Sequence, residues 1–184
     1  MTTTKTSKPA PPEAAVQADA HWAAKMERLR QRALAETTFV ICDDQEVRSR
    51  YQRARRNHDL AQDYLNAHPD DEEARQQAGT AAAEYVQAKT AYDEASIPLR
   101  FRALPRLAFE GLLKTHAPSE KEAEEGRQWA DSFPAALIAA ASVDGMTEDE
   151  ARDLLDAWSL AEANAMFNAA YSVQDTTRAD VGKG

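Results

Sequence analysis

The chain has 184 residues, of which 43% are hydrophobic and only 7% aromatic, and its formal net charge is −9. This length accommodates one ordinary domain core. The negative charge works against a sequence-independent grip on nucleic acid or on an anionic membrane, because both require clustered positive charge. The single cysteine excludes an internal disulfide, and no apolar run is long enough for a signal peptide or a bilayer span. We therefore expect a cytosolic protein without nucleic-acid or membrane partners.

The N-terminal region is expected to contain a tail and one helix. Residues 1–19 combine threonine, alanine and three prolines with one large apolar residue after the initiator, a composition that indicates a disordered tail. Residues 20–36 are expected to form a helix, because apolar residues recur there at helical spacing. These residues are Trp22, Met26, Leu29 and Ala33.

Residues 37–42 are β-branched and apolar, which predicts a strand. Asp43 with Glu46 then predicts a capped helix start. The clearest periodic signal of the sequence follows. Small and apolar residues then recur at alternating steps of three and four in two successive segments, as in packed helices. The first segment has Val47, Tyr51, Ala54, His58, Ala61, Leu65 and His68, and the second has Ala74, Ala78, Ala81, Tyr85, Ala88, Tyr92 and Ala95. We predict an antiparallel helical hairpin with a seam made mostly of alanine.

The two arms of this hairpin carry opposite charge. Five arginines lie from Arg48 to Arg56, with Tyr51 among them, whereas the second arm is acidic. Its acidic residues are Glu72, Glu73, Glu84, Asp93 and Glu94. The arginines could form a nucleic-acid patch or could pair with the acidic arm, and we favour the second interpretation, which places Arg53 near Glu84.

The chain changes character at residues 99–118. Leu99, Phe101 and Ala103 alternate with two arginines, which predicts a strand that pairs antiparallel with residues 37–42 at the base of the hairpin. An open edge of this ribbon is a candidate docking point. A helix is then expected from Pro105 to about His116. Its apolar side has Phe109, Leu112 and Leu113.

Short helices with strong start signals follow Pro118. Three Ser/Thr-x-x-Glu sequences fit the capping box, in which the first side chain and the glutamate cap each other's backbone N–H groups. They are Ser119 with Glu122, Thr147 with Glu150, and Ser159 with Glu162. Apolar stripes on helices at 132–143, from 148 and from 160 predict a compact bundle.

The predicted fold class is therefore mainly α: an antiparallel helical hairpin flanked by a short two-stranded antiparallel β ribbon, followed by a small helical bundle. The expected order is a disordered tail (1–19), a region of helix, strand, hairpin and strand (20–104), a C-terminal bundle (105–174) and a flexible tail (175–184).

No grouping of residues suggests an enzyme. The four histidines lie in separate elements, the carboxylates fall at helix starts or on polar faces, and the glycines form no phosphate-binding loop. We expect no catalytic, cofactor-binding or metal residues.

The tripeptide His68-Pro69-Asp70 resembles the HPD signature of J-domain co-chaperones, which would imply stimulation of an Hsp70 partner. The alternative is that Pro69 and Asp70 end one helix and cap the next. The second helix restarts at once, no tyrosine-rich helix precedes the motif and the second arm has an alanine seam, so we favour the alternative.

The aromatic residues of the second half have two interpretations: anchors for a partner chain, or core. The residues that we single out as partner-docking candidates are Phe101, Leu104, Phe109, Trp129, Phe133, Trp158 and Phe167.

The order of these elements carries a family resemblance. Leu104-Pro105-Arg106 precedes a helix that ends near His116-Ala117-Pro118; Trp129 and the run from Phe133 to Ile138 follow, and a tryptophan-bearing helix leads into a last alanine-rich one. In this order the chain resembles the tail assembly chaperones of long-tailed bacteriophages, particularly those of actinobacterial hosts. The resemblance extends to the strand, charged hairpin and returning strand.

This resemblance implies a non-enzymatic chaperone in the host cytoplasm that is absent from the mature virion. It would bind the tape measure protein, keep it soluble during tail assembly and help to recruit the major tail tube protein. It also implies a longer form made by ribosomal frameshifting, of which this chain would be the unshifted product. The alternatives are a coiled-coil structural or scaffolding component of a viral particle and, less favoured, a J-domain-like co-chaperone.

Overall fold

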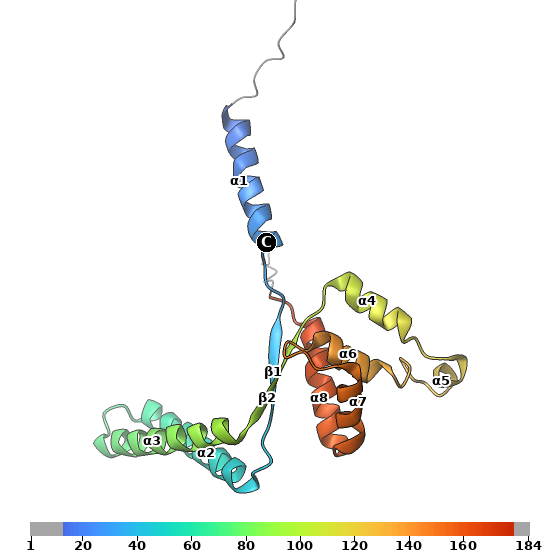
Figure 1. Cartoon of the computed structure of the whole chain (residues 1–184). Coiled ribbons are helices and arrows are strands. Elements are labelled where there is room, and N and C mark those ends of the chain that lie inside the picture. Colours follow the sequence, from blue (N-terminus) through green and yellow to red (C-terminus); the bar gives the residue numbers. More distant parts are fainter. Residues whose placement is uncertain (1–12, 179–184) are drawn as a thin grey trace, which may run out of the picture. The chain divides into compact units, whose positions relative to one another are not determined.

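The structure is a computed structural model that describes residues 13–178, with side chains described from residue 21 onward (Figure 1). The chain divides into two compact units, residues 1–34 and residues 35–184. Residues 1–12 of the predicted N-terminal tail and residues 179–184 of the predicted C-terminal tail lie outside the described residues. The mainly α fold with one two-stranded antiparallel ribbon is confirmed.

Helix α1 (Glu13–Arg30) belongs to the first unit. It begins at Glu13 rather than at residue 20, so the prediction of a tail was wrong for residues 13–19. This stretch is rich in alanine with glutamate and glutamine, all good helix formers, and it follows two prolines that suit a helix start. Low hydrophobicity therefore does not exclude a helix in a segment of this composition.

The β ribbon consists of β1 (Glu36–Ile41) and β2 (Ile97–Arg102), which pair antiparallel as predicted. Glu36 lies opposite Arg102 at one end and Ile41 lies opposite Ile97 at the other. The Arg102 Nε donates to Glu36 Oε1 at 2.7 Å, so the first pair is joined by its side chains as well as its backbone. Because α2 follows β1 and α3 precedes β2, the ribbon closes the base of the helical hairpin.

The hairpin consists of α2 (Gln45–Ala67) and α3 (Glu72–Ala95), which pack along each other (Figure 1). Tyr51 stacks on Tyr92 with ring centroids 4.5 Å apart, and further along α2 the His58 ring stacks on Tyr85 at 5.0 Å. The order of these contacts shows that the two helices are antiparallel. All seam positions are buried or half-buried except His68 and Ala95 at the ends, which confirms the heptad pattern.

Asp44 and Asp71 cap the two hairpin helices. Asp44 Oδ1 accepts from the N–H groups of Glu46 and Val47, and Asp71 Oδ1 accepts from Glu73 and Ala74. The caps predicted from the sequence were Asp43 and Asp70, each one residue before the observed cap. Local sequence does not distinguish two adjacent aspartates that both precede a helix.

The predicted pairing of the charged arms was wrong. No ion pair within 4 Å joins Arg53 to Glu84 in the described part of the chain, and both residues are exposed. The ion pairs among the described hairpin residues lie within single helices, as in Arg75–Glu72. Between the helices, Arg50 Nη2 donates to Gln87 Oε1 at 3.2 Å. Exposed charges gain little from pairing, so the apolar seam decides how the helices meet.

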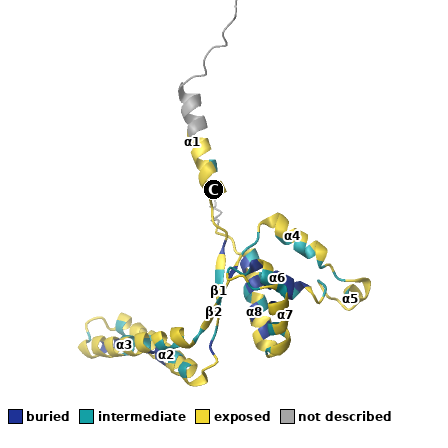
Figure 2. Cartoon of the chain, viewed as in Figure 1, coloured by how far each residue is buried: buried dark blue, intermediate teal, exposed yellow. Residues whose placement is uncertain are grey.

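The C-terminal bundle follows β2. Its helices are α4 (Arg106–Thr115), α5 (Glu120–Glu124), α6 (Phe133–Ala141), α7 (Glu148–Ala157) and α8 (Leu160–Ser172), and the 3₁₀ turn η1 (Val173–Asp175) ends it. Helix α6 carries no charged residue and six of its nine residues are buried, so it forms the centre, with α7 and α8 packed on it (Figure 2). All three predicted capping boxes are formed, at the starts of α5, α7 and α8.

The ribbon and the bundle share one core. Phe101 of β2 is fully buried with Phe133, Leu137 and Met166, and the Phe39 ring of β1 lies 6.3 Å from that of Trp158. The ribbon thus packs on helices, as expected for two strands that are marginal alone.

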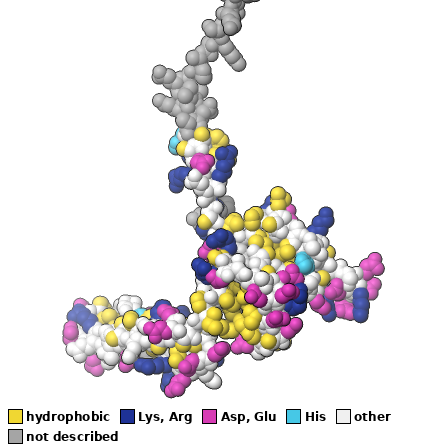
Figure 3. All heavy atoms as spheres, in the orientation of Figure 1, with side chains coloured by type: hydrophobic (Ala, Val, Ile, Leu, Met, Phe, Trp, Pro, Cys, Tyr) yellow, Lys and Arg dark blue, Asp and Glu magenta, His cyan; other side chains and the backbone are white. Residues whose placement is uncertain are grey.

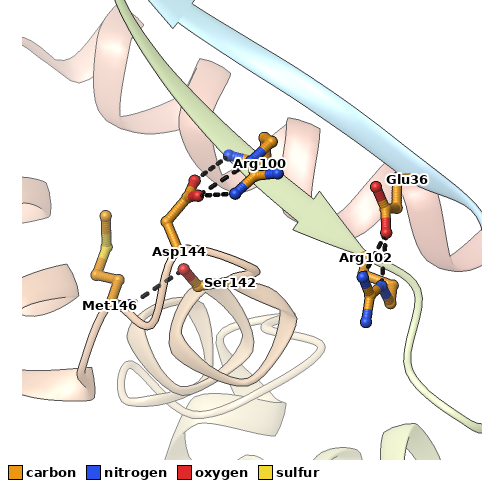
Figure 4. A network of polar contacts seen from close by, with 6 residues as sticks. All are labelled: Glu36, Arg100, Arg102, Ser142, Asp144 and Met146. Atoms are coloured by element: carbon orange, nitrogen blue, oxygen red, sulfur yellow. Dashed lines mark hydrogen bonds and ion pairs between the residues drawn. The ribbon is translucent and has the colours of Figure 1, made fainter.

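The loop after α6 fastens the outer edge of β2 (Figure 4). Phe101 forms a β-bridge with Ser142, and Val143 N–H donates to the Arg100 carbonyl at 2.9 Å. Asp144 accepts from the Arg100 backbone N–H at 2.8 Å and from its Nη2 at 2.6 Å. Gly145 follows with a φ of 83°, a conformation that favours glycine. This edge is therefore not open to a partner strand at Phe101.

Candidate functional site

Aromatic rings gather where the loop before α6 meets α8. Trp129 lies 5.1 Å from Phe133, 5.6 Å from Phe167 and 5.6 Å from Tyr171, measured between ring centroids. Tyr171 also meets Phe109 of α4 at 6.2 Å, edge to face. These rings join α4, α6 and α8 through contacts of the kind that stabilise cores beyond their buried area.

The outer side of this cluster forms the floor of an open groove of about 710 Å³ between α6, α7 and α8. Trp129, Pro134, Leu155, Ala163 and Phe167 supply its apolar lining. A second hollow of about 360 Å³ adjoins it, since both are lined by Trp129, Asp131 and Pro134. We call the two together the bundle groove. Figure 3 shows hydrophobic side chains gathered over the bundle, with acidic side chains at the margins.

Backbone and side-chain bonds hold Trp129 in place. The Ala130 N–H donates to the carbonyl of His116 at 2.9 Å, and the Phe133 N–H donates to Ala130. His116 Nδ1 lies 2.8 Å from Ser132 Oγ, which joins the end of α4 to the residue before α6. The aromatic floor is therefore pre-formed.

The charged residues at the rim of the groove are Asp131, Arg152 and Asp156. Arg152 already donates to Glu148 at 2.7 Å and to Asp149 at 3.0 Å, and Asp131 accepts from Arg127. Asp156 makes no ion pair within the described residues. The rim thus keeps its net negative character next to an apolar floor.

Three carboxylates of the bundle are stabilised in their charged form. The hydroxyl and then the N–H of Ser119 hold the pKa of Glu122 below its ordinary value, and the N–H and hydroxyl of Thr147 do the same for Glu150. The Arg100 side chain, followed by its backbone N–H, lowers the pKa of Asp144. Each of the three accepts hydrogen bonds from a helix cap or an ion-pair partner, so the lowered pKa values follow from contacts that hold local structure together.

The structure brings together three of the predicted docking residues and buries one of them. Trp129 and Phe167 are half-buried and line the groove, while Phe133 lies beneath them, fully buried. Phe101 is also fully buried. Phe101 and Phe133 therefore cannot anchor a partner at the surface, because their rings fill the shared core, and for them the alternative interpretation as core residues holds.

The other three candidates lie elsewhere. Leu104 and Phe109 are half-buried at the start of α4, where the Leu104 N–H donates to Gln174 Oε1 at 2.8 Å. Trp158 ends α7 and meets Phe39 of β1. Whether any of these three docks a partner remains a prediction.

Several groove residues were not predicted. Pro134, Leu155 and Asn164 line it, and none of them is among the docking residues predicted from the sequence. Leu154 and Leu155 are adjacent on α7, and adjacent helical residues point about 100° apart, so both cannot point straight at α6. The adjacent leucines Leu154 and Leu155 therefore indicate that one of the two side chains turns toward the surface.

The HPD tripeptide forms the turn of the hairpin. His68 Nδ1 lies 3.1 Å from the Tyr64 carbonyl oxygen, and its ring lies 4.4 Å from that of Tyr64. Arg75 Nη2 donates to the Pro69 carbonyl at 2.7 Å. The three residues therefore end α2 and lead to Asp71, the cap of α3.

Comparison with known proteins gives no family: no family model matches the sequence, and no curated protein or solved structure matches it. Within residues 13–178, no three histidine, cysteine or carboxylate side chains gather where they could hold a metal ion. None of the described helices has the length and apolar character required to cross a membrane.

Proposed function

We propose that this chain is a tail assembly chaperone of a long-tailed bacteriophage, a non-enzymatic protein that binds the tape measure protein and keeps it soluble during tail assembly. The observation that carries the proposal is the bundle groove, an open apolar hollow that the chain's own side chains leave unfilled. The volume of its larger hollow, about 710 Å³, lies within the range of ligand-binding clefts in proteins.

A chaperone must hold an apolar segment and later release it. The groove offers Trp129 and Phe167 as half-buried aromatic anchors, and its rim stays polar, which suits a contact of limited area. The pre-formed floor lowers the cost of ordering on binding. The sequence resemblance supplies the identity of the segment: an apolar helix of the tape measure protein.

The proposal extends to the partners and location that the resemblance implies. The major tail tube protein and a longer, frameshifted form of this chain are further proposed partners, and the chain would act in the host cytoplasm and be absent from the mature virion. Sequencing of the gene tests the frameshift: a slippery heptamer followed by an overlapping reading frame is expected.

Co-expression with the tape measure protein tests the main proposal. We expect the soluble fraction of the tape measure protein to rise with this chain and a complex to be recovered. Replacing the half-buried Leu155 with aspartate should abolish this effect, because a charge in the apolar lining opposes docking of an apolar segment. The matched control is Leu60→Asp on α2, where the leucine is exposed and outside the groove.

A photo-crosslinking amino acid in place of Asn164, an exposed groove residue, tests the location even if Leu155→Asp lowers the stability of the bundle. We expect crosslinks to the tape measure protein from this position and none from Gln62 on α2. Equal solubility of the tape measure protein without this chain, together with no complex, would contradict the proposal.

The hairpin favours a second candidate, a coiled-coil component that remains in an assembled particle, because its heptad seam is well formed. Protein analysis of purified particles separates the two candidates. The chaperone should be missing from them, whereas a scaffolding component would be present in fixed stoichiometry.

A further inference from the structure

The outer face of α2 carries positive charge that the molecule itself does not neutralise. The nine residues from Arg48 to Arg56 include five arginines and no carboxylate, in a chain with a net charge of −9. Three of these arginines border a hollow of about 450 Å³ beside the two helices. We call this the arginine face: Arg48, Tyr51, Gln52, Arg55, Arg56, with Asp59 as its one carboxylate, and, from α3, Tyr92.

The carboxylates of α3 leave this face free. Arg48 and Arg56 are exposed and make no side-chain hydrogen bond or ion pair within the described residues, and Arg55 has only a distant contact of 4.0 Å with Asp59 on its own helix. The acidic residues of α3 that form pairs do so locally, as in Glu72 with Arg75 and Asp93 with Lys89. Two unpaired guanidinium groups and a third that is weakly paired therefore point to an outside partner with negative charge.

The aromatic rings next to the arginines distinguish between anionic partners. Single-stranded nucleic acid is held by bases that stack on aromatic faces. Here Tyr51 stacks on Tyr92 at 4.5 Å and on Tyr85 at 5.9 Å, so the ring at the centre of the face is engaged with two others. These observations favour an acidic protein segment over nucleic acid.

We propose that the arginine face binds an acidic α-helix of a partner protein, which lies along α2 with its carboxylates toward Arg48, Arg55 and Arg56. Arg48 and Arg55 are seven residues apart, a rise of about 10.5 Å along the helix. Glutamates one heptad apart on a partner helix have the same spacing. The proposal does not depend on the bundle groove or on the identity of its occupant.

A labelled helical peptide of about three heptads, with alanines and with glutamates on one face one heptad apart, is the probe. We expect fluorescence anisotropy to show binding that weakens as salt is raised from about 0.05 M to about 0.5 M. The triple variant Arg48→Gln, Arg55→Gln, Arg56→Gln should weaken it by about tenfold or more, given the usual strength of exposed ion pairs.

The matched control is Arg106→Gln, Lys114→Gln, Lys121→Gln, which makes the same change of net charge on the exposed surface of α4 and α5 and should bind as the unchanged protein does. Far-ultraviolet circular dichroism should show equal helix content in both variants, since none of the six residues lies in a seam or core.

Two further probes complete the test. A peptide of the same composition with glutamates spread around the helix should bind several-fold more weakly, and equal binding would overturn the role of spacing. Tighter binding of a single-stranded oligonucleotide of equal charge would overturn the proposal in favour of nucleic acid. Equal binding by the triple variant and its control would overturn the arginine face itself.

Discussion

The hairpin and the bundle are both helical, yet they bury different material. The residues buried in α2 and α3 are Ala54, Ala74, Ala78 and Ala88. The bundle and the ribbon instead bury Phe101, Phe133, Leu137, Ile138, Met166 and Val173 almost completely. Hydrophobic stabilisation scales with buried apolar area, so most of it lies in the bundle. The hairpin depends instead on close approach of its backbones, ring stacking and caps.

This difference indicates how the two regions respond to substitution. A core of large side chains is weakened when atoms are removed, whereas an alanine seam has little to lose by truncation and is weakened when atoms are added. Truncation is thus expected to separate the two regions, because it weakens the bundle far more than the hairpin.

The largest effect is expected from Phe133→Ala, which removes a fully buried ring at the centre of the bundle. The loss of contacts with Trp129 and Phe167 and the cavity left behind should lower the free energy of unfolding by about 3–5 kcal/mol. Urea unfolding followed by tryptophan fluorescence measures it. Leu60→Ala, on the exposed surface of α2, should change the free energy of unfolding by less than about 0.5 kcal/mol. A similar loss of stability in the two variants would contradict the contrast between bundle and hairpin.

An intermediate effect is expected from Ala78→Leu, which adds atoms at a buried position of the seam. The helices must move apart, at a cost of about 1–3 kcal/mol. Hydrogen exchange should show lower protection in α2 and α3 and unchanged protection in α6 and α8. Ala83→Leu makes the same change on the exposed side of α3 and is the control; equal protection in both variants would show that the seam is not closely packed.

The smallest effect is expected from pH, and its direction differs between the regions. Glu122, Glu150 and Asp144 have pKa values lowered by folding, so their stabilising contribution is complete above the ordinary values of 4.5 and 3.8 and is lost as pH falls below them. In the hairpin the Tyr51 hydroxyl raises the pKa of Tyr85, and Asp93 raises that of Lys89, so their contribution is lost as pH rises above about 10.

Thermal unfolding against pH measures this contrast. Hydrogen exchange of the bundle should become faster in acid relative to the hairpin, and Glu150→Gln should reduce the acid sensitivity. Loss of hairpin helicity before bundle helicity in acid would contradict the assignment.

Local signals were the ones that sequence alone could predict. The capping boxes depend on residues three apart, the seam depends on a helical period and the strand alternation at Leu99 and Phe101 depends on a period of two; all of these are present. The exact cap could not be chosen between Asp43 and Asp44, because either satisfies the local rule.

What could not be predicted depends on contacts between distant elements. Phe133 and Trp129 are four residues apart and both aromatic, but only the packing of α8 decides that one is core and the other is the floor of the groove. The Arg53–Glu84 pairing failed for a related reason: charge pattern gives complementarity between faces, but not which exposed side chains meet. The loop from Ser142 to Met146 on the edge of β2 gave no sequence signal beyond Gly145.

The order of elements along the chain has a consequence for synthesis on the ribosome. Both helices of the hairpin are complete once residue 95 has emerged, so it can form early. Phe101 and the wholly uncharged α6 emerge next, yet the residues that cover them, up to Val173, come last. A growing chain that stops between Ala141 and Val173 therefore leaves its most hydrophobic helix incompletely covered. For that interval α6 lacks the residues of α8 and η1 that cover it in the folded protein.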